Sequence, residues 1–180
     1  MKITFDQLYN DHHQDLYQFI FYMVKDKSLT EDLLQEVYLK VFKSLPRFRG
    51  DSSVKTWLLS IARHVVIDYF RSQKRKRKRF VDFFDWGEKG EKLKDAQPLP
   101  DEIAEQQEEI QNLYRCLDNC TVDQKSVIIL RYIQSFSIRE TAEILNFSES
   151  KVKTTQHRGL KVLKMAMEKY KKGEADYERL

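Results

Sequence analysis

Apolar side chains recur at intervals of three and four residues along most of the chain, which is the period of amphipathic helices rather than strands. Residues 3–25 form the first such segment, with a bend expected at the two adjacent histidines in its middle. In the second segment a capping box begins at Ser28, with Thr30 as the alternative cap. Pro46 ends this helix because proline disfavours helical geometry in the preceding residue. The apolar face of the second helix includes Phe42.

A third helix is predicted to begin at Ser52 or Ser53 and to continue into a basic run at residues 71–79. Its apolar face contains Trp57, which we assign to the core rather than to a stacking surface. After this run the helical period is lost, and aromatic residues stand among Gly, Asp, Glu and Lys before two prolines. Residues 80–101 therefore predict a linker.

The C-terminal half contains three further helix start signals. Asp101 is placed to cap a helix over residues 102–118, and capping boxes begin at Thr121 and Ser137. Together with the N-terminal half, these signals predict an all-α protein. It would consist of two small helical domains, residues 1–79 and 102–180, joined by a flexible linker.

The last start signal opens a pattern typical of a helix-turn-helix. Such a motif needs a small residue where its helices cross and a turn residue that tolerates the left-handed conformation. Ala142 and Asn146 meet these two requirements, and Ser148 caps the second helix. The apolar contacts that lock the helix pair would come from Ile138, Leu145, Phe147 and Val152.

The second helix of this motif carries the residue types that read duplex DNA. If it enters a major groove, the residues near its N-terminus face base edges, and more distant cations contact phosphates. The candidates for base contact are Glu149, Ser150, Lys153, Thr154 and His157. The candidates for phosphate contact are Lys151, Arg158 and Lys161. A solvated basic helix without a specific partner is the alternative interpretation of the same spacing.

The composition narrows the class of protein. Five glycines and three prolines in 180 residues disfavour a turn-rich β-fold. Cys116 and Cys120 are too few for a disulfide framework and have no neighbouring set of zinc ligands. We find no secretory signal, no apolar run long enough to insert into a membrane, and no phosphate loop, nucleophile–base pair or metal cluster. We therefore expect a cytoplasmic protein that is not an enzyme and needs no cofactor or metal.

Charge is distributed unevenly along the chain. The net charge is only +4, but residues 71–79 hold seven basic residues out of nine. Residues 82–109 hold ten acids and three lysines, a net charge of −7. Such a basic run is suited to sequence-independent binding of phosphates, and a solvated charge block is its alternative interpretation.

Two separated segments resemble bacterial sigma-70-type initiation factors, in particular their small extracytoplasmic-function (ECF) group. The N-terminal half is similar to their second conserved region through EDLLQEVYLKVF, FRGDSSVKTWL and IARHVVIDYFR. The C-terminal half is similar to their fourth region, including the helix-turn-helix. The resemblance covers roughly residues 5–75 and 102–168, in the expected order and without a third region between them.

The resemblance implies roles for particular residues. The face of the second helix that would dock on the β′ clamp helices of core RNA polymerase consists of Asp32, Gln35, Glu36 and Lys40. The residues that would contact a melted minus-10 element are Ser44, Phe48, Asp51, Ser52, Ser53, Ile61, Arg63, His64 and Arg71. The helix-turn-helix would read a minus-35 element as duplex DNA. The acidic linker resembles a connector toward the polymerase active cleft, and its aromatics Phe83, Phe84 and Trp86 are an alternative partner patch.

The function implied by the resemblance is promoter-specific initiation of transcription together with core RNA polymerase, including its β flap. An anti-sigma factor, membrane-anchored in some relatives, is a further candidate partner. A stand-alone helix-turn-helix regulator is the main alternative, although such a regulator needs no EDLLQEV or FRGDSS segment. A nucleic-acid-modifying enzyme would need a cluster of carboxylates or metal ligands, which the sequence does not indicate.

Overall fold

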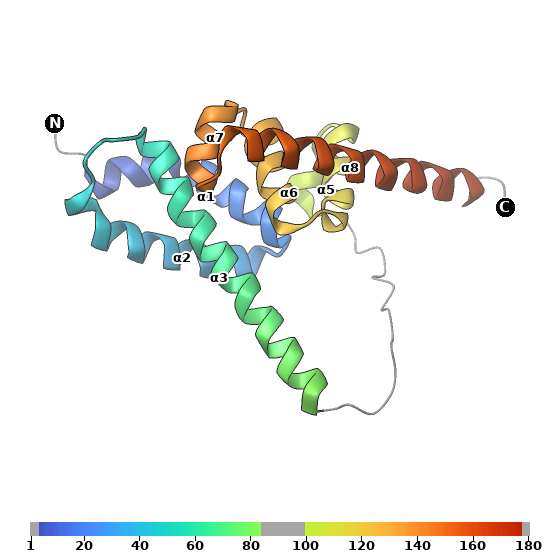
Figure 1. The fold of residues 1–180 in the computed structure, drawn as a ribbon, viewed down its shortest axis with the longest axis horizontal. Helices are drawn as coiled ribbons and strands as arrows, with labels where there is room; N and C mark the ends of the chain where they lie inside the picture. Colours follow the sequence, from blue (N-terminus) through green and yellow to red (C-terminus); the bar gives the residue numbers. More distant parts are fainter. Residues whose placement is uncertain (1–3, 84–99, 178–180) are drawn as a thin grey trace.

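The computed structural model describes residues 4–83 and 100–177, and within these ranges every regular element is helical. The all-α prediction is therefore confirmed. Figure 1 shows two helical halves packed side by side, with the end of α3 and the end of α8 projecting from the body in different directions. The elements are α1 Phe5–Val24, α2 Lys27–Ser44, η1 Leu45–Arg47, α3 Val54–Phe83, α4 Asp101–Ala104, α5 Glu108–Cys116, η2 Leu117–Asn119, α6 Val122–Ile128, the π-helical turn η3 Ile129–Ile133, α7 Ile138–Leu145 and α8 Glu149–Tyr177.

The first two helices meet at a tight turn. α1 is one continuous helix without a break at the histidines, and Lys25 ends it in the left-handed conformation at φ 58°. The cap of α2 is Asp26, whose carboxylate accepts a hydrogen bond from the Leu29 amide at 2.7 Å. The predicted cap at Ser28 or Thr30 is therefore wrong, because a carboxylate two residues earlier already satisfies the first free amides.

The third helix, α3, spans 30 residues. Ser53 caps it as predicted, with the hydroxyl accepting a hydrogen bond from the Thr56 amide at 3.1 Å. The helix continues to Phe83, so the expected loss of helical structure after residue 79 comes four residues later. Its distal half projects beyond the body in Figure 1. Of the other linker aromatics, Phe84 and Trp86 lie outside the described residues.

The start of the C-terminal half differs from the prediction. A single helix over residues 102–118 is wrong, because α4 ends at Ala104 and α5 begins only at Glu108. The Gln111 amide nitrogen donates to the carbonyl oxygens of Ala104 and Gln106, both at 2.9 Å. These bonds satisfy backbone acceptors that the break leaves without helical partners. The capping boxes at Thr121 and Ser137 are confirmed.

The helix-turn-helix of α7 and α8 has the predicted local geometry. Asn146 adopts the left-handed conformation at φ 53° and ψ 46°, and the Ser148 hydroxyl caps α8 by accepting from the Lys151 amide at 3.1 Å. Ala142 and Val152 are buried between the helices. Gly159 allows α8 to approach α6 closely, because a Cβ atom there would lie 2.8 Å from a side-chain carbon of Ile128.

The two halves share one buried core in this structure. α7 packs against α3, and the end of α1 packs against α6 and η3. The rings of Phe21 and Tyr22 contact Tyr114 of α5 at centroid distances of 5.9 and 5.8 Å. The Gln134 amide donates to the Asp15 carbonyl at 2.7 Å. These contacts hold the two halves of the chain in one arrangement.

Candidate nucleic-acid and polymerase interface

The predicted polymerase-binding face of α2 is open to solvent. Asp32, Gln35 and Glu36 are exposed, and Lys40 is half-buried with its ammonium 3.3 Å from the Glu36 carboxylate. Such an i, i+4 pair at the surface contributes little to stability, so these charges remain available to a partner. The structure brings the four residues together on one side of one helix.

The same helix exposes two large apolar side chains that the sequence reasoning missed. Leu39 is 63% exposed and Phe42 is 68% exposed. Phe42 was expected on the apolar face toward the core. Instead its ring contacts the edge of the Phe5 ring, at a centroid distance of 6.1 Å. The signal was present in the sequence, because five apolar residues in the six positions 37–42 exceed what one buried face of a helix accommodates. An exposed apolar pair flanked by charges is typical of a protein-binding surface.

The predicted minus-10 residues lie at the end of α2, along the loop that follows it, and on α3 as far as Arg71. The Phe48 ring packs on Trp57 at 4.6 Å, and Trp57 is half-buried against the core as expected. Ile61 and His64 follow Trp57 at helical spacing on the same side of α3. The Ser44 hydroxyl donates to the Lys40 carbonyl at 2.7 Å.

The loop residues of this set differ in exposure and in structural role. Asp51 is exposed, Ser52 is half-buried, and Ser53 serves as the cap of α3. Gly50 holds a positive φ of 77°, which directs the chain from the loop toward this cap. The loop therefore presents short polar side chains beside the Phe48 ring, which is the composition expected for contacts with unstacked bases.

Two arginines of the minus-10 set behave differently. Arg71 is exposed beyond the body, with a 4.0 Å approach to Asp68. Arg63 instead turns toward the C-terminal half, where its guanidinium is 4.0 Å from the Asp123 carboxylate and 5.4 Å from the centre of the Phe147 ring. Burial lowers the pKa of the Arg63 guanidinium from its ordinary value, and the Asp123 carboxylate opposes that shift. The structure therefore does not leave Arg63 free for DNA.

The predicted minus-35 residues share the exposed side of the first turns of α8. All eight are exposed, namely Glu149, Ser150, Lys151, Lys153, Thr154, His157, Arg158 and Lys161. Of these, Lys151 lies against residues of its own half, with its ammonium 3.4 Å from the Phe147 ring centre and 3.8 Å from the Asp123 carboxylate. Val152, Gly159 and Leu163 occupy the opposite, buried side of the helix.

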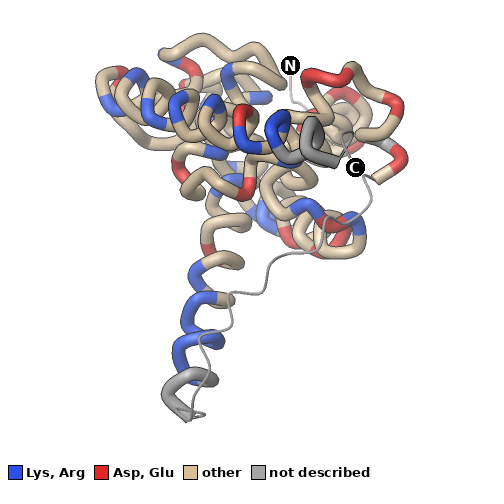
Figure 2. Tube along the Cα trace, turned by 90° about the vertical axis from the view of Figure 1, so that its right-hand side faces the viewer, with Lys and Arg blue, Asp and Glu red and all other residues tan. Residues whose placement is uncertain are grey.

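The basic run forms a helical stalk at the distal end of α3, which we define as residues 74–79. All six of its side chains are exposed. Figure 2 shows the basic positions, in blue, on the part of the helix that stands away from the body. They form three like-charge pairs at i, i+3 and two at i, i+4 without an intervening acid. Each pair destabilises an isolated helix by about 0.2–0.5 kcal/mol, and a polyanion removes this repulsion.

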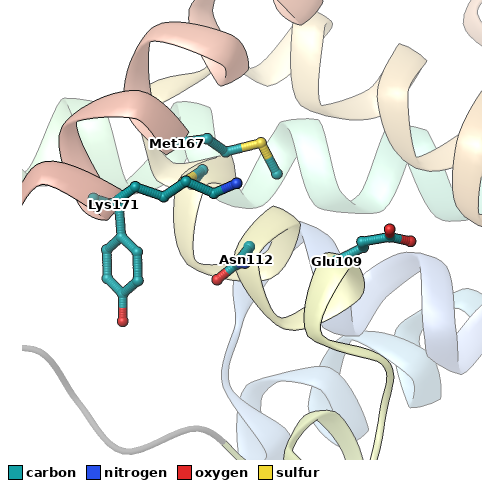
Figure 3. Close-up of a pocket in the computed structure, with 6 residues that line it drawn as sticks. Glu109, Asn112, Met167 and Lys171 are labelled. Atoms are coloured by element: carbon teal, nitrogen blue, oxygen red, sulfur yellow. The ribbon is translucent and has the colours of Figure 1, made fainter. Parts of the chain in front are cut away.

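Residues 4–83 and 100–177 contain no group of three His, Cys, Asp or Glu side chains placed to hold a metal. A cavity of about 200 Å³ lies between α5 and α8, lined by Glu109, Asn112, Cys116, Met167, Tyr170 and Lys171 (Figure 3). It contains none of the predicted site residues. Burial raises the pKa of the Cys116 thiol in its wall, so this group is a poor nucleophile.

The two cysteines and the two histidines of α1 are buried or half-buried. Both cysteines are free thiols, and burial raises the pKa of Cys120 to about 11. The two histidines of α1 are half-buried, and the His13 ring forms a 2.9 Å hydrogen bond with the Tyr38 hydroxyl. Among the described helices, none combines the length and apolarity needed to cross a membrane.

Comparison with known proteins decides the family. Residues 8–76 match the family model of sigma-70 region 2, and residues 110–163 match that of sigma-70 region 4. The chain is 61% identical to the ECF RNA polymerase sigma factor SigX of Bacillus subtilis over 93% of its own length and 86% of that protein. The chain belongs to the ECF group of sigma-70 family RNA polymerase sigma factors. It therefore acts with core RNA polymerase in promoter-specific initiation of transcription.

Other relatives agree with this assignment. The sigma factor is 31% identical to the RNA polymerase sigma factor YlaC of Bacillus subtilis, with 95% of this chain and 96% of that protein covered. Its fold is similar to that of the sigma factor RpoE from Bartonella quintana, solved in complex with the anti-sigma factor NepR. The TM-score is 0.65 at 25% identity, over 91% of this chain and 96% of that one. The family consists of initiation factors rather than enzymes, and it disfavours a stand-alone regulator.

Proposed function

We propose that this sigma factor docks on the clamp helices of the polymerase β′ subunit through the exposed face of α2. The observation that supports this proposal is the composition of that face. It joins the polar set at Asp32, Gln35 and Glu36 to the exposed apolar pair Leu39 and Phe42. A buried apolar anchor surrounded by polar contacts is the usual arrangement of a protein interface that carries binding energy.

Promoter reading is divided between the two halves in this proposal. The loop at residues 48–53 and the exposed side of α3 contact the melted minus-10 strand, with Phe48 as the wall of a pocket for one extruded base. The N-terminal turns of α8 enter the major groove of the minus-35 element, where Lys153 is suited to guanine. The stalk at residues 74–79 binds the DNA backbone next to the minus-10 region.

Two further partners belong to the proposal. The solved relative RpoE carries the anti-sigma factor NepR, and a partner of this class is proposed for the present chain. The β flap of polymerase is proposed as a contact of the C-terminal half. Because the template and polymerase are in the cytoplasm of a bacterium, that is where we place the protein.

Reconstitution with core polymerase tests the proposal. Wild-type protein and core polymerase are expected to start RNA synthesis at discrete positions in a library of random promoters. Asp32→Arg is expected to lose holoenzyme assembly while its helical content stays that of the wild type, because Asp32 is exposed and bonds nothing in the core. Asp11→Arg, an exposed position on α1, is the matched control. Assembly of Asp32→Arg with wild-type affinity would refute this docking face.

A gel-shift experiment addresses the alternative function. A stand-alone regulator would bind its duplex tightly without polymerase, whereas this sigma factor is expected to need core polymerase for a stable, sequence-selective complex. Tight selective binding by the isolated chain would favour the alternative.

A further inference from the structure

Arg63 and Lys151 come from different halves of the chain and meet at one carboxylate. The Asp123 side chain lies 4.0 Å from the Arg63 guanidinium and 3.8 Å from the Lys151 ammonium. Both cations also lie against the Phe147 ring, at 5.4 and 3.4 Å from its centre. Both are expected to contact DNA, Arg63 at the minus-10 element and Lys151 at the minus-35 element.

A second carboxylate repeats this arrangement at the other end of the contact between the halves. Asp118 lies 3.0 Å from the Lys25 ammonium at the end of α1 and 3.2 Å from the Lys125 ammonium of α6. The Lys125 ammonium also donates to the Met23 carbonyl at 3.4 Å. Asp118 and Asp123 therefore each bridge one cation of the C-terminal half and one cation of the N-terminal half.

We propose that Asp118 and Asp123 form an autoinhibitory latch that holds the free sigma factor closed and occupies DNA-binding cations of both halves. The Asp123 carboxylate takes the place of a DNA phosphate at Arg63 and Lys151. Opening separates Arg63 from Asp123, whereas Lys151 stays in the same half as this carboxylate. Promoter DNA and the closed form therefore compete for Arg63, and promoter DNA and the Asp123 carboxylate compete for Lys151. The competition rests on the proposed function, whereas the closure itself does not.

The surroundings of Arg63 make the latch sensitive to this one carboxylate. The Arg63 side chain is only 14% exposed, and its Nε atom is buried without a hydrogen-bond partner among the described residues. A buried cation is tolerated when a counter-charge is close and is costly when that charge is removed. In the open form water solvates the guanidinium. Removing the Asp123 charge therefore destabilises the closed form more than the open form, in which the carboxylate faces only the exposed Lys151 of its own half.

Two double variants with the same net charge test the latch. Asp118→Asn/Asp123→Asn removes both bridging carboxylates, and Glu143→Gln/Glu168→Gln removes two charges elsewhere on the C-terminal half. Glu143 is a fair match because it is 43% exposed, compared with 45% for Asp123, and pairs with Arg139 of its own helix. Circular dichroism checks that each variant keeps its helical content.

Small-angle X-ray scattering of the free protein measures closure. At low salt we expect the latch variant to have a larger radius of gyration and a longer maximum dimension than the wild type and the control. At high salt we expect the wild type to approach the latch variant, because salt screens the bridging pairs. Scattering profiles of the latch variant and wild type that coincide at every salt concentration would overturn the latch.

Binding of a fluorescent mixed-sequence duplex measures the competition. The latch variant is expected to bind more tightly than the control, by about tenfold if one wild-type molecule in ten is open. Equal affinities of the two variants would refute the competition even if scattering shows opening. Failure of wild-type protein to initiate transcription with core polymerase would refute the proposed function instead, and the scattering result would be unaffected by it.

Discussion

Phe42→Ala separates a role in polymerase binding from a role in the fold. About two thirds of the Phe42 side chain is in solvent, at 68% exposure, and its nearest ring is that of Phe5 at 6.1 Å. Full burial of a phenylalanine is worth about 1.5–3 kcal/mol, so covering the exposed two thirds contributes roughly 1–2 kcal/mol to binding. That corresponds to a loss of about 5- to 30-fold in affinity for core polymerase.

The assay for this prediction is equilibrium binding of labelled sigma factor to core polymerase, followed by fluorescence anisotropy. Thermal unfolding of Phe42→Ala is expected to stay close to that of the wild type, because little of the side chain is buried. Tyr132→Ala is the matched control, since Tyr132 is an aromatic residue of the other half with 48% exposure. Wild-type affinity of a folded Phe42→Ala variant would show that the apolar pair on α2 is not part of the docking face.

Three further predictions concern the C-terminal half. Gly159→Ala is expected to lower the stability of this half by about 1–3 kcal/mol in denaturant unfolding, because the new Cβ would lie 2.8 Å from Ile128, and unchanged stability would refute this close packing. Hydrogen bonds from Ser137 hold the pKa of the Glu140 carboxyl below its ordinary value, so its stabilising effect is present above the unfolded pKa and is lost as the pH falls through the folded value. Glu140→Gln is therefore expected to melt below the wild type at pH 6 and level with it at pH 3, and a gap that persists at pH 3 would contradict this origin. Lys153→Ala is expected to reduce promoter discrimination by about 1–3 kcal/mol in competition binding of holoenzyme if it contacts a base, whereas a uniform loss with a shallower salt dependence would assign it to phosphate.

The features that could be predicted from sequence are those with local causes. The caps at Thr121, Ser137 and Ser148 depend on a side chain and an amide within three residues, and the left-handed Asn146 depends on its own conformational freedom. The amphipathic period likewise located the buried side of α8. These features need no knowledge of the rest of the fold.

The features that could not be predicted depend on residues far apart in the chain. The break before α5 is stabilised by a glutamine side chain that reaches back five and seven residues. The exposure of Phe42 depends on how α1 covers α2, and the inward turn of Arg63 depends on Asp123, which lies sixty positions later in the sequence. Periodicity reports which residues are apolar, but not which apolar residues a neighbouring helix covers.

The proposed division of promoter reading between two halves lowers the affinity for DNA that either half needs. Linked sites act at a high effective concentration once one of them is bound, so two weak contacts together give a selective complex. The few exposed side chains on α8 and the short polar loop at residues 48–53 are each small for a self-sufficient DNA site. Loss of one base contact should therefore weaken initiation only partly. Loss of the proposed docking face on α2 should abolish initiation, because in this proposal that face joins both readings to one polymerase.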